Sequence, residues 1–289
     1  MEPVEVVWLV AACVTLAAWV LSLLTRDSSW VDRAWSIVPV AYVWILAAPS
    51  GDPRALLVGV LVTLWGARLT FNFARRGGYT GLEDYRWPIL RARMRPWQYQ
   101  VFQLVFICVA QNALLVAITL PVQTVTLHPT SALGPGDAVL TALFLGFLVL
   151  ETAADQQQHA FHRERAAAAE SGRPLAVGFR TTGLFRYSRH PNYFGELGQW
   201  WVVFGFGAIA AGTVVLPTVT GAVALTFLFV GSTLFTESLS VARHPRYADY
   251  RRSTSMIVPL PPRRPPGSTA SARPGTLGAP TRREGAPDA

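Results

Sequence analysis

The stretch GLFRYSRHPNYFGELGQW, residues 183–200, decides how this chain folds because it carries a polar motif directly into an apolar run, Trp200 to Ala211. Pro191 suits the first turn of a helix, where its missing N–H costs nothing. Three polar side chains then follow at i, i+4 and i+7 and share one helical face: Asn192, Glu196 and Gln199. Because polar groups inside a bilayer are costly, such a stripe marks a site that holds something polar. The stretch predicts a helix that enters a membrane with a binding site along one face.

Cationic or titratable side chains gather just outside this predicted helix: Arg186, Arg189 and His190. Tyr187 and Tyr193 lie beside them. The arrangement suits a ligand with a phosphate-bearing part outside and a neutral amide or ring inside. In the simpler alternative, Asn192 caps the helix and Glu196 complements its dipole. That alternative does not account for Gln199, which continues the same stripe deeper.

The composition is that of a membrane protein, since 51% of the 289 residues are hydrophobic and only 15% are charged. Several apolar runs reach the roughly 20 residues that a membrane-spanning helix needs. Seven runs are predicted to be spans: about 4–24, 34–49, 55–74, 101–120, 137–154, 193–212 and 214–235. The first is expected to be a retained span rather than a signal peptide, and the short second run is either a span or re-entrant. The last two form a tight hairpin around Thr213 to Pro217. The predicted fold class is therefore an all-α polytopic membrane protein.

The 25 basic residues are all Arg, and their distribution predicts the topology. With seven spans, 23 of the 25 fall in the loops 25–33, 75–100 and 155–192 or in the C-terminal tail. This positive-inside bias places the N-terminus outside and the C-terminus in the cytoplasm. The net charge of +8 thus reports topology and contact with membrane lipids, and we expect no nucleic-acid partner. Abundant Arg without Lys is typical of a GC-rich bacterial genome, so the expected location is the cytoplasmic membrane of a bacterium.

The chain is expected to form one membrane domain, residues 1–262, followed by a disordered tail, residues 263–289, that has few apolar anchors. Helical periodicity continues from Glu151 past the expected membrane edge until Gly172 and Pro174 stop it. Cys13 and Cys108 both lie in predicted spans and are most simply small hydrophobes, so neither a disulfide nor a metal site is indicated.

A second polar face is predicted on the fifth span, within ETAADQQQHAFHRER. Its members recur at helical spacing: Glu151, Asp155, Gln158 and His162. They are either the polar continuation of a helix that leaves the membrane or acceptors for ribose hydroxyls and an adenine amine. His159 and His162 at i, i+3 could also ligate a metal, but no third ligand has a convincing spacing.

Charged residues also enter the second and third predicted spans. Asp32 opens the second span within RDSSWVDRAW, and Arg68 lies in the third span with Asn72 one turn on. Such groups nearly always face a cavity or one another. Asp32 and Arg68 therefore either form a structural pair or polarise a substrate carbonyl and orient a cofactor. After the last span, RHPRYADYRRSTSMIVPLPP supplies either interfacial anchors or a cover for a nucleotide, with Tyr247 in its centre.

Over most of residues 20–262 the chain resembles the steroid 5-alpha-reductase superfamily, in particular its bacterial branch of membrane proteins. The resemblance is strongest in GLFRYSRHPNYFGE with the following Gln199-Trp200, in the Glu151–Asp155 helix and in YADYRRSTSMIVP. It implies seven transmembrane helices and an NADPH cofactor held from the cytoplasmic side. It also implies an oxidoreductase that transfers hydride to a carbon–carbon double bond conjugated with a carbonyl, in a sterol-like or enoyl lipid taken from the bilayer.

The resemblance also assigns roles to particular residues. Asn192 and Glu196 match positions near the nicotinamide, Asp155 matches one near the adenosine, and the SRHP segment matches the loop around the phosphates. Glu151 stands where better-known reductases carry Asn. The expected cofactor-binding set is Glu151, Asp155, His162, Arg186, Tyr187, Arg189, His190, Asn192, Tyr193, Glu196 and Tyr247. The substrate-polarising residues of the steroid enzymes have no clear counterpart, and the candidates in the corresponding regions are Asp32, Trp65 and Arg68.

A competing resemblance uses part of the same pattern. RHP-x-Y-x-G is similar to the motif of isoprenylcysteine carboxyl methyltransferases and phospholipid methyltransferases, which bind S-adenosylmethionine. Glu237 and the pair Tyr247–Tyr250 partly fit the C-terminal half of those enzymes. The Asn in RHPNYFGE and the acidic stripe on the fifth span favour the reductase. A non-catalytic lipid-binding protein is the third alternative.

Overall fold

The computed structural model describes residues 1–263 except 82, 174 and 176, and this part of the chain is helical with no strand. Its α-helices are α1 Pro3–Thr25, α2 Trp30–Ala34, α3 Val38–Ala47, α4 Pro53–Arg75, α5 Arg86–Ala92, α6 Pro96–Phe102, α7 Gln111–Leu127, α8 Pro135–Glu170, α9 Pro191–Ala211, α10 Val219–Arg243 and α11 Tyr247–Ser253. Two short 3-10 helices, Ala48–Ser50 and Gly183–Arg186, and a π-helical segment, Gln103–Ala110, complete the set. The predicted all-α class is confirmed. The disordered tail predicted for 263–289 lies outside the described residues, apart from Arg263.

Five helices are long and apolar enough to cross a membrane: Pro3–Thr25, Pro53–Arg75, Pro96–Leu127, Pro135–Glu170 and Val219–Arg243. The first four each contain one of the seven predicted spans, and Val219–Arg243 overlaps the span predicted at 214–235. The apolar run at 34–49 instead gives the short helices α2 and α3. The run at 193–212 gives α9, which has 21 residues and begins with the polar stripe. The predicted hairpin is present, since α9 ends at Ala211 and α10 begins at Val219.

Proline and local capping set several helix starts. Pro191 occupies the first turn of α9, as the sequence predicts. Asp52 caps α4 by accepting a hydrogen bond from the Ala55 amide at 2.9 Å. Helix α8 runs for 36 residues, about 54 Å at the usual rise of roughly 1.5 Å per residue, which is longer than a bilayer core of roughly 30 Å. The predicted continuation of this helix to a point just before Gly172 is confirmed.

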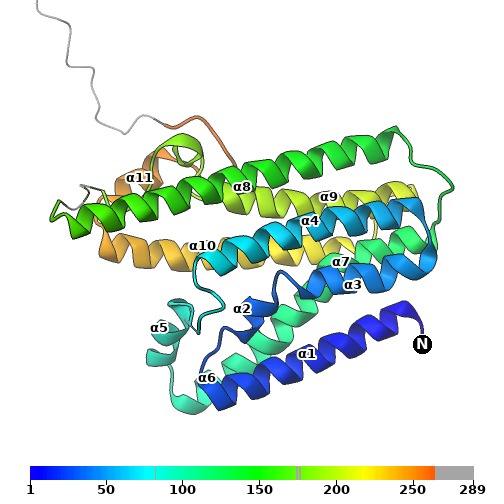
Figure 1. Ribbon diagram of the computed structural model, residues 1–289, viewed down its shortest axis with the longest axis horizontal. Coiled ribbons are helices and arrows are strands. Elements are labelled where there is room, and N and C mark those ends of the chain that lie inside the picture. Colours follow the sequence, from blue (N-terminus) through cyan, green and yellow to red (C-terminus); the bar gives the residue numbers. More distant parts are fainter. Residues whose placement is uncertain (82, 174, 176, 264–289) are drawn as a thin grey trace, which may run out of the picture.

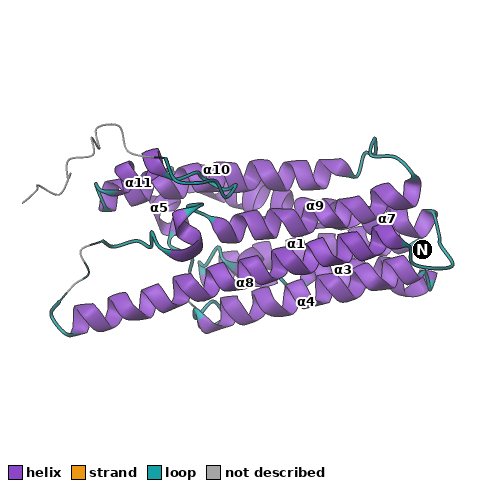
Figure 2. Ribbon diagram, turned by 90° about the horizontal axis from the view of Figure 1, so that it is seen from above, coloured by secondary structure: helices purple, strands orange, loops and turns teal. Residues whose placement is uncertain are grey.

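The long helices lie side by side in one bundle, with their axes close to the long direction of the molecule (Figures 1 and 2). Helix α9 packs against α7, α8 and α10. Gly195 permits the closest part of the α8–α9 contact, because a Cβ there would lie 2.7 Å from Cβ of Glu151 and 2.9 Å from the carbonyl oxygen of Phe147. This approach brings the polar stripe of α9 against the polar face of α8.

Polar contacts join neighbouring turns at the end of the bundle that carries the N-terminus. The N-terminus lies at the end opposite α5 and α11 (Figure 1). At the N-terminal end, Thr130 donates its amide N–H to Asp52 at 2.6 Å, which joins the turn before α4 to the turn before α8. Arg54 at this end is neutralised by Asp137, with Nε and Oδ1 2.6 Å apart.

The chain beyond α11 returns to the start of α9 and forms a C-terminal strap, residues 254–260. The amides of Arg189 and His190 donate to the carbonyls of Ser255 and Met256 at 2.9 and 3.0 Å. The Leu260 amide donates to the Tyr187 carbonyl at 2.9 Å. The strap therefore fixes the loop that leads into α9.

Candidate functional site

Three carboxylates and one guanidinium meet between α4, α8 and α9. Arg68 of α4 forms an ion pair with Glu151 and a second with Asp155 at 2.7 Å, both on α8. Its Nη2 lies 3.6 Å from Oε2 of Glu196 on α9. All three carboxylate residues are buried. Buried carboxylates are stable only with cations or hydrogen-bond donors around them, so these contacts fix the relative rotation of the three helices.

Neutral donors complete the shell around these carboxylates. Glu196 accepts a hydrogen bond from the indole N–H of Trp65 at 3.0 Å and another from Trp200 at 3.3 Å. Gln199 donates its amide to Glu151 at 2.7 Å. Asn72 donates to Asp155 at 2.7 Å. Each carboxylate thus accepts at least one hydrogen bond from a helix other than its own. These contacts between helices hold the cluster in one geometry.

These carboxylates form one wall of a cavity of about 800 Å³. Its charged and amide lining side chains are Asp32, Asn72, Arg76, Asp84, Arg86, Gln111, Glu151, Asp155, Asn192 and Glu196. Apolar and aromatic side chains also line it: Phe102, Phe106, Phe227, Leu228 and Phe235. Trp35 and Trp87 also line it. The cavity is therefore amphipathic and large enough for a lipid-sized or nucleotide-sized ligand.

Asp32 faces this cavity from α2, and it does not form the structural pair with Arg68 that was one of the two alternatives for these residues. The indole N–H of Trp87 donates to Asp32 at 2.9 Å, whereas Arg68 is taken by the carboxylates of α8. Burial raises the pKa of the Asp32 carboxyl from its ordinary value, and the nearby Arg86 offsets only part of this rise. Asp32 thus differs from the other cavity carboxylates, because it belongs neither to the Arg68 cluster nor to the Asp84–Arg86 ion pair.

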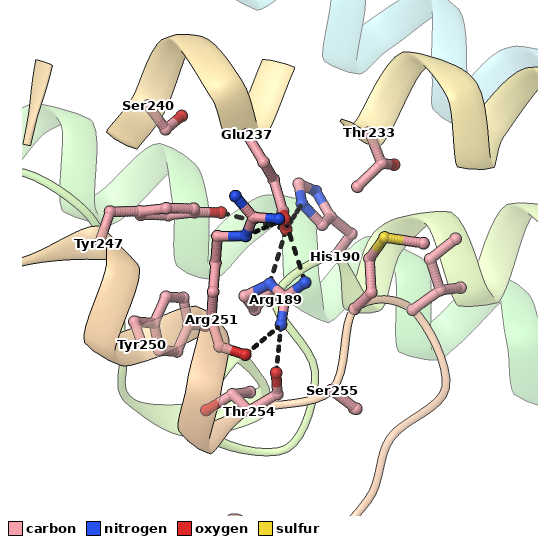
Figure 3. A network of polar contacts seen from close by, with 12 residues as sticks. Arg189, His190, Thr233, Glu237, Ser240, Tyr247, Tyr250, Arg251, Thr254 and Ser255 are labelled. Carbon is pink, nitrogen blue, oxygen red and sulfur yellow. Dashed lines mark hydrogen bonds and ion pairs between the residues drawn. The ribbon is translucent and has the colours of Figure 1, made fainter. Parts of the chain in front are cut away.

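A second buried network, the Glu237 clasp, joins α10 to the start of α9 and to α11 (Figure 3). Arg189 forms a two-pronged ion pair with Glu237, Nε to Oε1 at 2.6 Å and Nη2 to Oε2 at 3.0 Å. His190 and Arg251 approach the same carboxylate at 3.0 and 3.2 Å. The Tyr247 hydroxyl donates to it at 3.4 Å, and burial together with the Glu237 charge raises the pKa of Tyr247.

Arg189 also ties the clasp to the C-terminal segment. Its guanidinium donates to the carbonyl of Arg251 at 3.0 Å and to that of Thr254. Because Arg189 is buried and its donors are directed to Glu237 and to backbone carbonyls, it serves the fold in this structure. The clasp holds the entrance of α9, and with it the start of the polar stripe.

The predicted site residues fall into four groups. Six line the cavity: Asp32, Glu151, Asp155, Asn192, Tyr193 and Glu196. Trp65 and Arg68 bind the cavity carboxylates from behind. Three belong to the clasp: Arg189, His190 and Tyr247. His162, Arg186 and Tyr187 are exposed and apart from the cavity, and His162 accepts a hydrogen bond from Gln158 at 3.1 Å.

Several cavity residues were not predicted from the sequence. Asp84, Arg86 and Trp87 come from the segment 75–100, which the sequence identifies only as an arginine-rich loop and which contains α5. Nothing in the local pattern distinguishes these residues from interfacial anchors. Glu237 had a clearer signal, because it is a carboxylate within the apolar run that forms α10, and such a residue marks a buried partner.

Comparison with known proteins places this chain in a family. It matches the family described as "Protein of unknown function (DUF1295)" over residues 18–254. It is 35% identical over 258 residues to a Schizosaccharomyces pombe protein named "Uncharacterized protein C594.04c", a match that covers 83% of this chain and 75% of the yeast protein. No solved structure matches the chain significantly. The matched residues contain α2 to α10, the carboxylate cluster and the Glu237 clasp, and the chain belongs to the DUF1295 family.

Proposed function

We propose that this protein is a membrane-embedded, NADPH-dependent reductase that acts on a conjugated carbon–carbon double bond of a lipid. The observation that carries the proposal is the amphipathic cavity, whose lining combines Asn192 and Glu196 of α9, the carboxylates Glu151 and Asp155 of α8, and aromatic side chains. The resemblance of these motifs to the steroid 5-alpha-reductase superfamily supports the same conclusion. A nucleotide and an apolar substrate need such adjacent polar and apolar surfaces.

The cavity lining fits part of NADPH better than the rest. Asn192 and Glu196 offer an amide and a carboxylate to the nicotinamide carboxamide, and Asp155 offers an acceptor for a ribose hydroxyl. The phosphates do not suit this acidic wall. They fit the rim, where the side chain of Arg76 is 43% exposed. When bound, NADPH would supply the hydride.

The residues of the chain would then bind, orient and exclude water. Trp65 and Arg68 contact Glu196 and Asp155, so they are positioning residues in this proposal. Asp32 is the catalytic candidate that reaches the cavity directly. Its carboxyl accepts a hydrogen bond from the Trp87 indole, and in its protonated form it would donate a hydrogen bond to a substrate carbonyl as negative charge develops on the oxygen.

We also propose that the chain crosses the membrane seven times, with the N-terminus outside and the C-terminus in the cytoplasm. The five long apolar helices would provide five of the crossings, and α9 and the run at 34–49, which contains α3, would provide the other two. The arginine bias supports this orientation, and Arg54 at the N-terminal end does not weaken it, because Asp137 neutralises its charge. The cytoplasmic membrane of a bacterium is the proposed location, and one relative of the chain comes from a yeast.

S-adenosylmethionine is the second candidate cofactor. Its sulfonium is a cation, and the cavity lining contains more carboxylates than guanidinium groups. A methyltransferase would use the same cavity with a lipid acceptor.

Thermal melting of the purified protein with NADPH, NADH and S-adenosylmethionine in parallel tests the proposal. A ligand that binds only the native state stabilises it by about 2.7 kcal/mol at a hundredfold excess over Kd. We expect NADPH to raise the melting temperature and S-adenosylmethionine to leave it unchanged. Stabilisation by S-adenosylmethionine alone would establish the methyltransferase alternative instead.

A further inference from the structure

The cavity is lined both by α10 and by the π-helical segment Gln103–Ala110, which joins α6 to α7. Phe106 of this segment is 41% exposed and Phe227 of α10 is 73% exposed, yet both side chains line the cavity. Two exposed aromatic residues that also line a cavity mark its opening. Because both lie within helices long and apolar enough to cross a membrane, the opening would face acyl chains in a bilayer.

Two backbone features keep this opening wide. A π-helical turn inserts an extra residue into the helix and is frequent at functional sites. Gly231 of α10 lines the cavity, and a Cβ at this position would meet no atom within 4 Å. The space in front of Gly231 is therefore not filled by protein. We call the opening framed by Phe106, Phe227 and Gly231 the lateral portal.

The polar lining of the same cavity carries excess negative charge. It contains five carboxylate residues: Asp32, Asp84, Glu151, Asp155 and Glu196. Among the described residues, the guanidinium groups that form ion pairs with these carboxylates come from Arg68, Arg76 and Arg86. Carboxylates in a low-dielectric site are stable only with donors or cations around them. A ligand that places hydrogen-bond donors or positive charge against these carboxylates would supply what the chain does not, and a ligand that places an anionic group directly against them would be repelled.

We propose that the cavity binds an amphipathic lipid that enters through the lateral portal, with its tail toward the bilayer and its polar end against the carboxylates. The polar end carries a hydroxyl or an ammonium group and no negative charge. Fatty acids and phosphate-bearing lipids are excluded by the carboxylate wall. The identification of this lipid as a substrate rests on the proposed reductase function, but its binding requires no cofactor.

Binding of hexadecylamine, hexadecanol and palmitate to the purified full-length protein in a neutral detergent, without any cofactor, tests the charge selectivity. Affinity is measured by thermal melting and by the fluorescence of the cavity tryptophans, Trp35 and Trp87. We expect the amine and the alcohol to bind, and palmitate to bind roughly tenfold or more weakly. Asp32→Asn should reduce the ratio of the affinity for hexadecylamine to the affinity for palmitate. Palmitate binding as tightly as the amine would overturn the proposal.

The portal is tested with a matched pair of glycine variants. Gly231→Leu projects a side chain into the open space of the portal, whereas Gly146→Leu adds the same side chain at an exposed position of α8 that also has no atom within 4 Å. We expect Gly231→Leu to abolish lipid binding and Gly146→Leu to retain it. Gly231→Ser should give an intermediate loss of lipid binding. It takes the place of Gly231→Leu in the comparison if the leucine variant melts early.

The outcomes separate the two proposals. Equal lipid binding by the Gly231 and Gly146 variants would rule out the portal, whatever the cofactor. A failure of NADPH to bind would remove the reductase function and leave the lipid results unchanged.

Discussion

Trp65 on α4 donates its indole N–H to Oε2 of Glu196 on α9, 3.0 Å away and 131 positions further along the chain. Trp200 donates to the other oxygen of the same carboxylate at 3.3 Å, and the two indole rings meet edge to face with centroids 4.9 Å apart. Glu196 is thus held between two tryptophans at the wall of the cavity. This contact couples the packing of the bundle to the orientation of a candidate cofactor-binding side chain.

Replacement of Glu196 by Gln is expected to reduce both stability and cofactor affinity. A Gln side chain has one acceptor oxygen, so one of the two indole N–H groups loses its partner and meets an amide donor. A buried unsatisfied donor costs about 1–3 kcal/mol. The melting temperature and the NADPH affinity of Glu196→Gln should therefore both fall. Glu164→Gln, at an exposed position of α8, serves as the control, and a Glu196 variant that matches it in both measurements would contradict the assignment.

Removal of Arg189 is expected to be strongly destabilising, because it leaves the buried Glu237 carboxylate without its closest cation. Breaking a buried ion pair at one partner costs about 3–5 kcal/mol, and replacing both partners by apolar residues costs much less. The double variant Arg189→Met/Glu237→Met should therefore melt higher than Arg189→Met alone. Thermal melting of both variants checks this coupling, with Arg163→Met on the exposed face of α8 as the control. A double variant that melts no higher than Arg189→Met alone would contradict the coupling of Arg189 to Glu237.

Asp32 gives a prediction for the pH dependence of stability. Burial raises the pKa of Asp32 in the folded protein above the ordinary value of 3.8, which applies to the unfolded chain. At pH values between the unfolded and the folded pKa, the native state therefore binds more protons than the unfolded state. Stability is therefore lost as the pH rises through this window, and the loss persists above it. Asp32→Asn keeps an acceptor for Trp87 and should melt higher than the wild type at neutral pH. The difference should close as the pH falls toward 3.8. A difference that stays constant with pH would refute the raised pKa.

The topology is checked with reporter fusions after Pro129 and after Pro262. Pro129 lies in the turn between α7 and α8, at the end of the bundle where Thr130 contacts Asp52. Pro262 follows the C-terminal strap at the arginine-rich end. The two reporters should report opposite sides of the membrane, with the second in the cytoplasm. Reporters on the same side would exclude an odd number of crossings between them.

The sequence by itself determined the helices and their polar faces. Apolar runs of sufficient length predicted the long helices, Pro191 predicted the start of α9, and the spacing of Glu196 and Gln199 predicted that both face the interior. These features depend on local hydrophobicity and on the helical repeat, which neighbouring residues alone specify. The acidic face of α8 was predicted for the same reason at Glu151 and Asp155, and both are buried.

The partners of these polar groups were decided only by the tertiary structure. Arg68 binds Glu151 and Asp155 rather than Asp32, because the packing of α4 against α8 turns its guanidinium away from α2. The return of the chain after α11 brings Arg189 onto Glu237 and so removes it from the expected phosphate site. Such choices depend on the rotation and close approach of helices that are far apart in sequence, and periodicity within one helix carries no information about either.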